Sequence, residues 1–493
     1  MRQEPSNQPG PAPQPALAVC LPGQRAAVVG LGISNLAVIR FLLRRGALVT
    51  AMDAKTPEQL GDRYRQLSSL AEEAGVDSGR LELRLGSGYL DGLARFPIAF
   101  LAPGLPKSLP LVQAAQEAGT ILSSEVHLVF ELCRAPILGI TGSAGKTTTT
   151  SLAGEIMKAT GRPTFVGGNI GTPLVETVES IPPGGQVVLE LSSFQLQLLS
   201  QSPPIGVVLN VSPNHLDVHA SMAEYIEAKK NIFRFQRPDD LTVLNADRPE
   251  TRAMAAECPG RVVWFSRLGE VERGAFVKGR EIVVRGEEGD RAVAEVGQIK
   301  ILGLHNLENV LAAVAATSLT GARPEEAAKA IIAFPGVVHR LELVRELDGV
   351  RYINDSIATA PDRTLAALHT LGAGEGQPAR LLLIAGGYDK HLPFDQLAEA
   401  MLGKVRILLL LGQTADLIEQ AVRRAAAKHG GQGGPAIVRG HSLDEMVTRG
   451  SEMARDGDVV LLSPACASYD MYRNFEERGE HFRRLVSQLG GRR

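Results

Sequence analysis

The stretch that decides the fold runs from Gly139 to Thr148 and has the sequence GITGSAGKTT. Apolar residues from Pro136 to Ile140 predict a strand before it, and Thr148 to Ala159 predicts a helix after it. Glycines let backbone N–H groups turn toward phosphate oxygens, and the helix N-terminus adds a partial positive charge. We therefore predict a triphosphate-binding loop formed by Gly142, Ser143, Ala144, Gly145, Lys146, Thr147 and Thr148.

Two side chains of this loop suit a nucleoside triphosphate. Lys146 would reach the outer phosphates, and the Thr147 hydroxyl would ligate a magnesium ion. The loop is tighter than the G-x-x-x-x-G-K-T pattern, because Ile140 stands five positions before Gly145. The alternative is a glycine and serine turn with a solvated lysine.

The chain has 493 residues, enough for about three domains, and 44% hydrophobic with 22% charged residues is typical of a soluble globular protein. A net charge of -2 disfavours nucleic acid or an anionic membrane as the main partner. The four cysteines show no metal or disulfide spacing, which favours a reducing cytoplasm. The longest apolar run, Val310 to Ala316, is far shorter than a membrane span.

Composition and pattern divide the chain into four parts. Residues 1–22 are rich in Pro and Gln and predict a disordered tail rather than a signal peptide. We expect a Rossmann-like domain over 23–124, a central P-loop ATPase-like α/β domain over 125–336 and a C-terminal Rossmann-like α/β domain over 337–493.

The first domain begins like a dinucleotide-binding fold. A strand is predicted at 26–29, a glycine turn at 30–32, a helix at 35–45 and a strand at 47–52, followed by Asp53. The third glycine of G-x-G-x-x-G is replaced by Asn35, so the signal for NAD is weak. The turn would either bind the diphosphate of another nucleotide or only pack against the helix. A further turn, 102–106, follows a strand at 98–101 and would also face a ligand.

Apolar runs separated by helices predict parallel sheets in the other two domains. The central strands are expected at 187–191, 205–211 and 241–245, and residues 276–284 with 290–298 are expected to form a small antiparallel excursion. The C-terminal strands are expected at 350–353, 381–385, 405–411, 436–438 and 458–462.

Three polar residues of the central domain are candidates for metal chemistry. Glu190 ends a buried strand, where ligands of parallel sheets bind, and would hold magnesium or cap a helix. His215, with Asp217 two residues later, follows the next strand and suits a metal site. Lys229 lies on an amphipathic helix beside Lys230, which by itself indicates a solvated face.

Further candidates surround the third domain. Residues 303–309 begin a helix with Asn306 and Asn309 on one face; these amides would bind an adenine edge or cap the helix. Arg340, at the domain junction, keeps its charge and can pair with a phosphate. Loops at 354–356, 386–390 and 463–468 follow three strands and would form one binding rim.

Taken together, these residues resemble the Mur ligase family, the ATP-dependent amino-acid adders of bacterial cell-wall synthesis. The resemblance covers nearly the whole chain from about residue 23. It rests on the Gly-Lys-Thr-Thr loop, Glu190, the segment 214–217, Lys229, 305–306, 339–340 and 354–356, in the family's order, and on 168–171, 190–196 and 461–479.

The resemblance implies a role for each candidate. ATP would contact the phosphate loop, His305, Asn306, Asn309, Arg340 and Asp355. Thr147 and Glu190 would hold one Mg2+ ion, and His215 with a carbamylated Lys229 would serve a second. The UDP group would contact Gly32, Ile33, Ser34, Asp53, Ala54, Gly104 and Asn169. D-Glutamate would contact Lys390, Ser468 and Phe475. The catalytic residues would be Lys146, His215, Lys229, Arg340 and Lys390.

The resemblance also implies a reaction. A γ-phosphoryl group would pass from ATP to the carboxylate of UDP-N-acetylmuramoyl-L-alanine, and the amine of D-glutamate would attack the acyl phosphate. Closure of the third domain onto the central one would complete the site. The enzyme is expected to be a cytoplasmic monomer with small-molecule substrates.

Four positions depart from the family pattern. Ala144 replaces an Asn of the phosphate loop, and Ala102 a Ser before Pro-Gly. Ile357 and Ala360 stand where many relatives carry Lys and Asn, which puts phosphate and amino-acid contacts of that loop in doubt.

Other functions fit part of the pattern. A folylpolyglutamate-type or cyanophycin-type ligase would share the ATP chemistry with another acceptor. A regulatory ATPase would leave Lys390 and Ser468 without a role, and an NAD oxidoreductase would leave the Lys146 loop unexplained.

Overall fold

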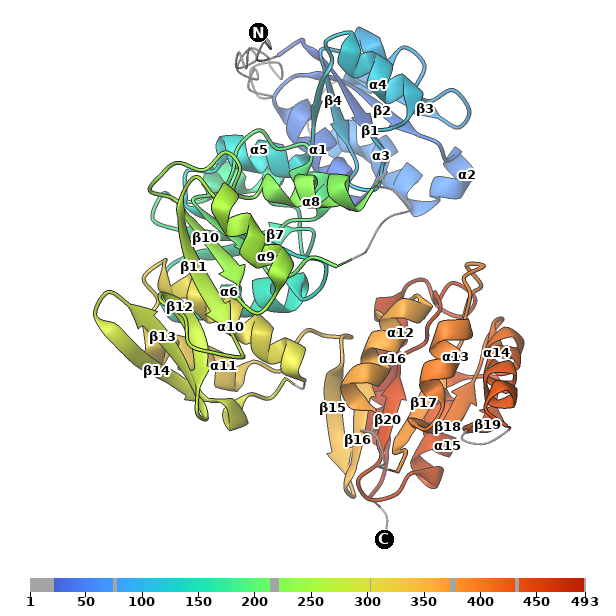
Figure 1. Cartoon of the computed structure of the whole chain (residues 1–493). Coiled ribbons are helices and arrows are strands. Elements are labelled where there is room, and N and C mark those ends of the chain that lie inside the picture. Colours follow the sequence, from blue (N-terminus) through green and yellow to red (C-terminus); the bar gives the residue numbers. More distant parts are fainter. Residues whose placement is uncertain are drawn as a thin grey trace, which may run out of the picture. The chain divides into compact units, whose positions relative to one another are not determined.

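A computed structural model describes residues 22–73, 78–212, 221–301, 303–372, 378–430 and 434–491. Three α/β sheets form its framework (Figure 1). The chain divides into two compact units, Met1–Gln298 with Leu307–Ile332, and Ile299–Asn306 with Ala333–Arg493. The first unit holds two sheets and the second unit holds the third. The predicted α/β class is confirmed.

The first sheet is parallel, in the order β3-β2-β1-β4-β5. Its strands are β1 (Arg25–Val29), β2 (Leu48–Asp53), β3 (Leu81–Leu85), β4 (Ile98–Leu101) and β5 (Ile121–Ser123). Its helices are α1 (Ile33–Arg44), α2 (Pro57–Leu60), α3 (Asp62–Glu73) and α4 (Pro110–Glu117), with short 3-10 helices η2 (Ser78–Arg80) and η3 (Leu93–Arg95). Strand order reverses between β1 and β4, so the predicted glycine turn lies where ligands of such sheets bind.

The central sheet has the order β14-β13-β12-β11-β10-β9-β6-β8-β7. Its strands are β6 (Ile137–Thr141), β7 (Thr164–Gly168), β8 (Gln186–Glu190), β9 (Ile205–Val208), β10 (Leu241–Asn245), β11 (Arg261–Ser266), β12 (Gly274–Lys278), β13 (Glu281–Gly286) and β14 (Gly289–Glu295). Strands β6 to β12 pair in parallel. Because β8, β6 and β9 are neighbours, the residues that follow them meet at one sheet edge.

Helices accompany this sheet along the chain. They are α5 (Glu125–Leu132), α6 (Lys146–Ala159), α7 (Ser193–Leu196), α8 (Met222–Lys230), α9 (Pro249–Met254), α10 (Leu304–Ser318) and α11 (Pro324–Ala333), with 3-10 helices η4 (Leu174–Glu176), η5 (Val178–Ser180), η6 (Ala255–Glu257) and η7 (Val296–Gln298). The apolar run from Val310 to Ala316 is buried throughout α10. It is therefore core, as its length suggested.

The predicted antiparallel excursion of the central sheet is confirmed. The chain turns within residues 276–284 and forms the hairpin β12–β13. Gly279 adopts a positive φ of 63° at the turn, a conformation that glycine tolerates best. Strand β14 then pairs antiparallel with β13. Figure 1 shows these three strands at the end of the central sheet.

The third sheet has the order β15-β16-β20-β17-β18-β19. Its strands are β15 (Glu342–Leu347), β16 (Val350–Asn354), β17 (Leu381–Ala385), β18 (Val405–Leu410), β19 (Ala436–Arg439) and β20 (Val459–Leu462). Its helices are α12 (Pro361–Leu371), α13 (Asp395–Met401), α14 (Ala415–Lys428), α15 (Leu443–Met453) and α16 (Phe475–Gln488). Helices α12 to α14 contribute to one apolar cluster and α15 and α16 to another, so both faces are covered.

One strand of the third sheet was not predicted. β15 pairs antiparallel with β16, so β16 is the second strand of this sheet rather than its first. The three loops predicted to form one rim follow β16, β20 and β17, which are neighbours. Their common edge is confirmed. In the part of the chain that the structure describes, every helix is too short or too polar to cross a membrane.

Candidate active site

The phosphate loop joins β6 to α6. Gly145 caps the helix with a positive φ of 85°, which a side chain would strain. The amine of Lys146 folds back over the loop and donates to the carbonyl oxygens of Gly142 at 2.8 Å and Ser143 at 3.3 Å. The loop thus has a cation, a helix N-terminus and turned backbone groups together, an arrangement that binds phosphates.

Asn210, two residues after β9, holds this loop through hydrogen bonds, and no role was predicted for it. Its Oδ1 accepts from the Ala144 N–H at 2.9 Å, and its Nδ2 donates to the Ala144 carbonyl at 3.1 Å. The backbone N–H of Ser143 donates to the Asn210 carbonyl at 3.0 Å. These three bonds fix the loop without using a side chain at position 144.

Lys229 is buried, with 1% of its surface exposed, so the solvated face suggested by the Lys-Lys pair is wrong for this residue. Its amine donates to the Gly142 carbonyl at 3.0 Å and lies 4.4 Å from the centre of the Tyr225 ring. The Tyr225 hydroxyl lies 3.0 Å from the Ser143 Oγ. Burial, and then the charge of Lys146, hold the pKa of Lys229 well below its usual value.

Glu190 ends β8 beside the phosphate loop and is buried. Its Oε1 accepts a hydrogen bond from Nδ2 of Asn169 at 2.9 Å. Within the described chain its Oε2 accepts no hydrogen bond. Such a buried carboxylate oxygen is costly unless something binds it. Asn169, predicted to contact the UDP group, is therefore placed against Glu190.

The predicted metal site is only partly described. His215 and Asp217 lie outside the described residues. Among the residues that the structure describes, no three of His, Cys, Asp or Glu are grouped to hold a metal ion. Thr147 lies in the first turn of α6, and Glu190 ends β8, the strand next to β6.

One residue near the start of α10, Asn309, lies against the phosphate loop. A Cβ atom built on Gly145 would lie 2.2 Å from Oδ1 of Asn309, so this amide occupies the space that a side chain would need. Asn306 and Asn309 are both buried, whereas His305 is exposed. The helix begins at Leu304, two residues before Asn306.

In the first domain the predicted UDP residues lie at the carboxyl ends of β1, β2 and β4. Asp53 accepts from the backbone N–H groups of Leu31 at 2.7 Å and Lys55 at 2.9 Å, so it braces the glycine turn. Ile33 is 67% exposed, and the other members, Gly32, Ser34, Ala54 and Gly104, are exposed or half-buried. An exposed apolar side chain beside a glycine turn suits a flat ring.

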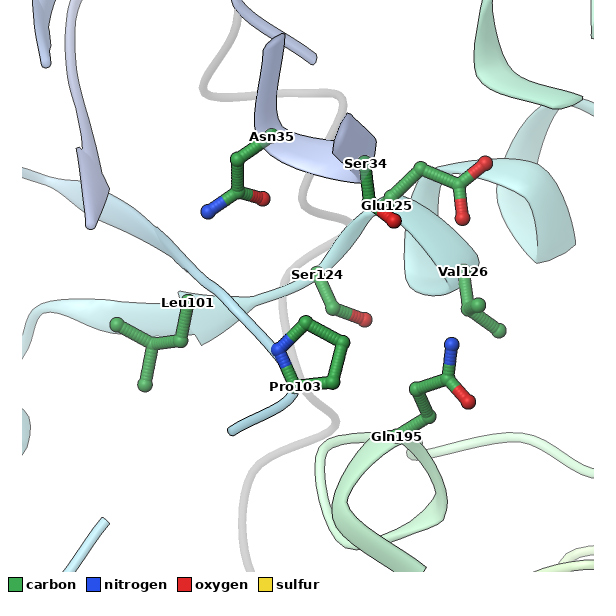
Figure 2. A pocket seen from close by; sticks show the side chains of 8 residues that line it. All are labelled: Ser34, Asn35, Leu101, Pro103, Ser124, Glu125, Val126 and Gln195. Atoms are coloured by element: carbon green, nitrogen blue, oxygen red, sulfur yellow. The ribbon is translucent and has the colours of Figure 1, made fainter. Parts of the chain in front are cut away.

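A small pocket lies where this rim meets the central domain (Figure 2). It has room for about one water molecule. It is lined by Ser34 and Asn35 from α1, Leu101 and Pro103, Ser124 to Val126 of α5, and Gln195 of α7. Burial raises the pKa of Glu125 to about 7, although the N–H groups of Val175 and Leu174 lower it.

Asp355 occupies the rim of the third domain, after β16. Its Oδ2 accepts from Ser463 Oγ at 2.8 Å, and its Oδ1 accepts from the Leu341 N–H at 3.2 Å. Burial raises the pKa of Asp355 to about 7, opposed by these bonds and by the charge of Arg340. The side chain thus joins the 339–341 segment to two strands of the rim.

The residues predicted to bind the amino acid come from two other loops of this rim and from α16. Lys390 donates to the Thr359 carbonyl at 3.2 Å, and burial lowers its pKa. Ser468 is buried, and Phe475 is the first residue of α16. The rings of Phe475 and His339 meet edge to face, with 6.3 Å between their centroids. All three lie in the same compact unit.

A buried arginine holds these loops together. The Arg478 guanidinium donates to Ser356 Oγ at 3.0 Å and to the Ser356 carbonyl at 2.9 Å. It also donates to the carbonyls of Cys466 at 3.2 Å and Ala467 at 3.3 Å. Arg478 stood in a quoted motif, but the sequence did not assign it a role.

Comparisons with known proteins agree with this geometry. The family model described as Mur ligase MurD-like, N-terminal domain, matches residues 24–124, the Mur ligase middle domain matches 140–317, and the Mur ligase, glutamate ligase domain, matches 339–466. A protein of Symbiobacterium thermophilum named UDP-N-acetylmuramoylalanine--D-glutamate ligase is 53% identical over 468 residues, covering 94% of this chain and 98% of its own. The chain belongs to the Mur ligase family.

Other Mur ligases extend the comparison. The protein of the same name from Acetivibrio thermocellus is 45% identical and covers 94% of this chain and 97% of its own. The structure of UDP-N-acetylmuramate-alanine ligase from Thermotoga maritima has a TM-score of 0.54 at 19% identity, covering 94% of this chain and 100% of its own. A MurF ligase from Thermotoga maritima, solved in complex with ADP, has a TM-score of 0.53 at 18% identity, covering 95% and 96%. These structures confirm the three-domain fold.

The four departures from the Mur ligase pattern have definite surroundings. Ala144 is held through its backbone by Asn210. Ala102 packs against Gly30, where a Cβ would lie 2.7 Å from the Ala102 Cβ. Ile357 donates through its N–H to the His339 carbonyl at 3.2 Å. Ala360 begins α12 without a side-chain cap.

Proposed function

We propose that this Mur ligase joins D-glutamate to UDP-N-acetylmuramoyl-L-alanine at the expense of ATP, in the synthesis of peptidoglycan precursors. The observation that carries the proposal is the convergence of Lys146 and the buried Lys229 on the Gly142 carbonyl, beside Glu190. Relatives that are 53% and 45% identical over nearly the whole chain are named as ligases of this specificity.

The chemistry follows from the low reactivity of a carboxylate. The substrate carboxylate attacks the γ-phosphorus of ATP, an O–P bond forms, and ADP leaves. The D-glutamate amine then attacks the acyl carbon, a C–N bond forms, a proton is lost, and phosphate leaves. Lys146 would neutralise charge on the transferred group, and the phosphate loop would fix its position.

Thr147 and Glu190 would hold magnesium. A hydroxyl and a carboxylate are oxygen ligands that suit this ion, and the buried Oε2 of Glu190 accepts no hydrogen bond from the described residues. A second ion would involve His215 and Lys229. Bound magnesium supplies charge neutralisation for phosphoryl transfer. Asn169 would orient Glu190 through its hydrogen bond.

Lys229 is proposed to carry a carbamate. Its lowered pKa favours the neutral amine, which is the form that adds CO2. A bond forms between the amine nitrogen and the carbon of CO2, one proton is released, and two carboxylate-like oxygens result. Intact-mass measurement in neutral solution, with and without CO2, tests this modification.

The remaining contacts are proposed from the family pattern. ATP would contact residues 142–148, His305, Asn306, Asn309, Arg340 and Asp355. The UDP group would contact Gly32, Ile33, Ser34, Asp53, Ala54, Gly104 and Asn169. D-Glutamate would contact Lys390, Ser468 and Phe475, with Arg340 and Lys390 assisting catalysis. We propose that the three domains span residues 23–124, 125–336 and 337–493, after a tail of residues 1–22.

Phosphate release with each substrate omitted in turn tests the function. Release that requires both UDP-N-acetylmuramoyl-L-alanine and D-glutamate supports the proposal, whereas release without either indicates a plain ATPase. Oxygen-18 in the acceptor carboxylate should appear in the released phosphate; its absence there contradicts the acyl-phosphate step. We also propose that the enzyme is a cytoplasmic monomer.

A further inference from the structure

A lysine of the first domain lies at the junction with the central domain. Lys107 follows β4, in the same loop as Gly104. Its amine donates to the Gln197 carbonyl at 2.7 Å. Gln197 caps the C-terminus of α7, where carbonyl groups lack partners within the helix and attract cations.

The same amine is linked to α8. Nε2 of Gln197 donates to Oε1 of Glu224 at 3.0 Å, and the Glu224 charge attracts the Lys107 ammonium. Burial lowers the pKa of Lys107 to about 8 despite this attraction. The ammonium is therefore largely removed from water, and its hydrogen bond is correspondingly strong.

Apolar contacts surround this polar link. Leu105 and Leu109, on either side of Lys107, pack with Leu198 against the cluster that covers one face of the first sheet. Leu198 follows Gln197 directly. The Lys107 loop and the end of α7 are thus joined both by burial and by a charged hydrogen bond.

One of these helices follows a residue of the proposed site, and the other carries such residues. Helix α7 begins at Ser193, three residues after Glu190, and α8 carries Tyr225 and Lys229. The loop itself carries Gly104, a proposed UDP contact. The Lys107 amine therefore connects the loop of Gly104 directly to the end of α7, and through Gln197 to Glu224 of α8.

We propose that Lys107 is a positioning residue that ties the UDP-substrate loop to α7 and α8, so that substrate binding depends on this link. The proposal rests on the proposed function. Without the ammonium, the loop must be ordered when the substrate binds, and that cost weakens binding. The phosphate loop precedes Glu190 in the chain and is not part of this link. The affinity for ATP should therefore be unchanged.

The test uses the full chain with Lys107→Met, which keeps the apolar stem. Calorimetric titration with UDP-N-acetylmuramoyl-L-alanine, without ATP, should show about tenfold weaker binding, as expected for loss of a charged hydrogen bond. The KM for this substrate should rise by a similar factor while the KM for ATP stays unchanged. Lys158→Met is the matched control, since Lys158 pairs only locally with Glu155 on the exposed face of α6 and should leave both values unchanged.

A second variant covers loss of folding. If Lys107→Met lowers the melting temperature so far that the protein is unfolded in the assay, Glu224→Gln replaces it. This variant keeps an acceptor for Gln197 but removes the charge that attracts Lys107, so it should weaken substrate binding about threefold. Equal substrate affinity of the variants and the wild type overturns the proposal, as does an equal rise of both KM values. If the wild type itself fails to bind the UDP substrate, the proposed function fails, and this inference with it.

Discussion

The amine of Lys229 and the carbonyl oxygen of Gly142 lie 3.0 Å apart, and Lys146 donates to the same oxygen at 2.8 Å. Two amines thus share one uncharged acceptor. Burial of Lys229, and then the charge of Lys146, hold its pKa well below the usual value and so favour its neutral form. The neutral amine is the form that the proposed carbamylation requires.

Replacement of Lys229 should separate activity from stability. Lys229→Met should lower ADP formation at least about a hundredfold, since even partners of metal ligands contribute 10- to 100-fold. The melting temperature should stay the same or rise, because an apolar side chain replaces a buried amine. Lys230→Met, on the adjacent position paired with Glu227 and Glu257, is the control and should keep its activity. Retention of a tenth of the activity by Lys229→Met would contradict the assignment.

Loss of the Asn169 amide should act through magnesium. Asn169→Ala should raise the magnesium concentration needed for half-maximal rate by about 10- to 100-fold, because Glu190 loses the partner that orients it. At saturating magnesium the rate should largely recover. Glu190→Ala should not recover, since the ligand itself is absent. A magnesium titration of the rate measures both, and an unchanged midpoint for Asn169→Ala argues against the metal role of Glu190.

Two glycines with the same backbone conformation should respond differently to alanine. Gly145 and Gly161 have φ values of 85° and 80°, so each substitution strains the backbone. A Cβ on Gly145 would also lie 2.2 Å from Oδ1 of Asn309, whereas nothing lies within 4 Å of one on Gly161. Gly161→Ala should cost roughly 1–2 kcal/mol of unfolding free energy and keep ATP affinity. Gly145→Ala should also weaken ATP binding in calorimetry. Equal ATP affinities would show that the Asn309 contact does not shape the loop.

Glu125 should make stability depend on pH. Its folded pKa is about 7, above the ordinary value of 4.5, so the folded state binds more protons than the unfolded state between these pH values. The free energy of unfolding should therefore fall as pH rises from 4.5 to 7, by on the order of 3 kcal/mol from this group. Glu125→Gln should remove this component, so it gains stability relative to the wild type with rising pH. Parallel denaturation curves for the two proteins across this range would contradict the shift.

Apolar runs located most of the parallel strands because both faces of such sheets are buried. Strands β4, β10 and β17 have the predicted bounds. Strand β15 was missed because it alternates exposed and half-buried residues at the edge of its sheet. The antiparallel excursion was located, but its division into β12, β13 and β14 was not predicted.

The site divides in the same way between local and spatial information. The phosphate loop and Glu190 could be found because each is attached to a strand end. The burial of Lys229 could not be read from the Lys-Lys pair, since adjacent helix positions point in different directions. Asn210 and Lys107 act on backbone groups far away in the sequence, and that pairing exists only in the fold.

Arg478, near the start of α16, is hydrogen-bonded to the loops at 356 and 466–467, so these three segments are held rigidly together. A planar guanidinium has five donors in a rigid fork, so displacing any acceptor strains the bonds to the others. Single substitutions in this part of the chain should consequently be poorly tolerated. The loops that carry the proposed D-glutamate contacts should keep the same arrangement with and without the amino acid.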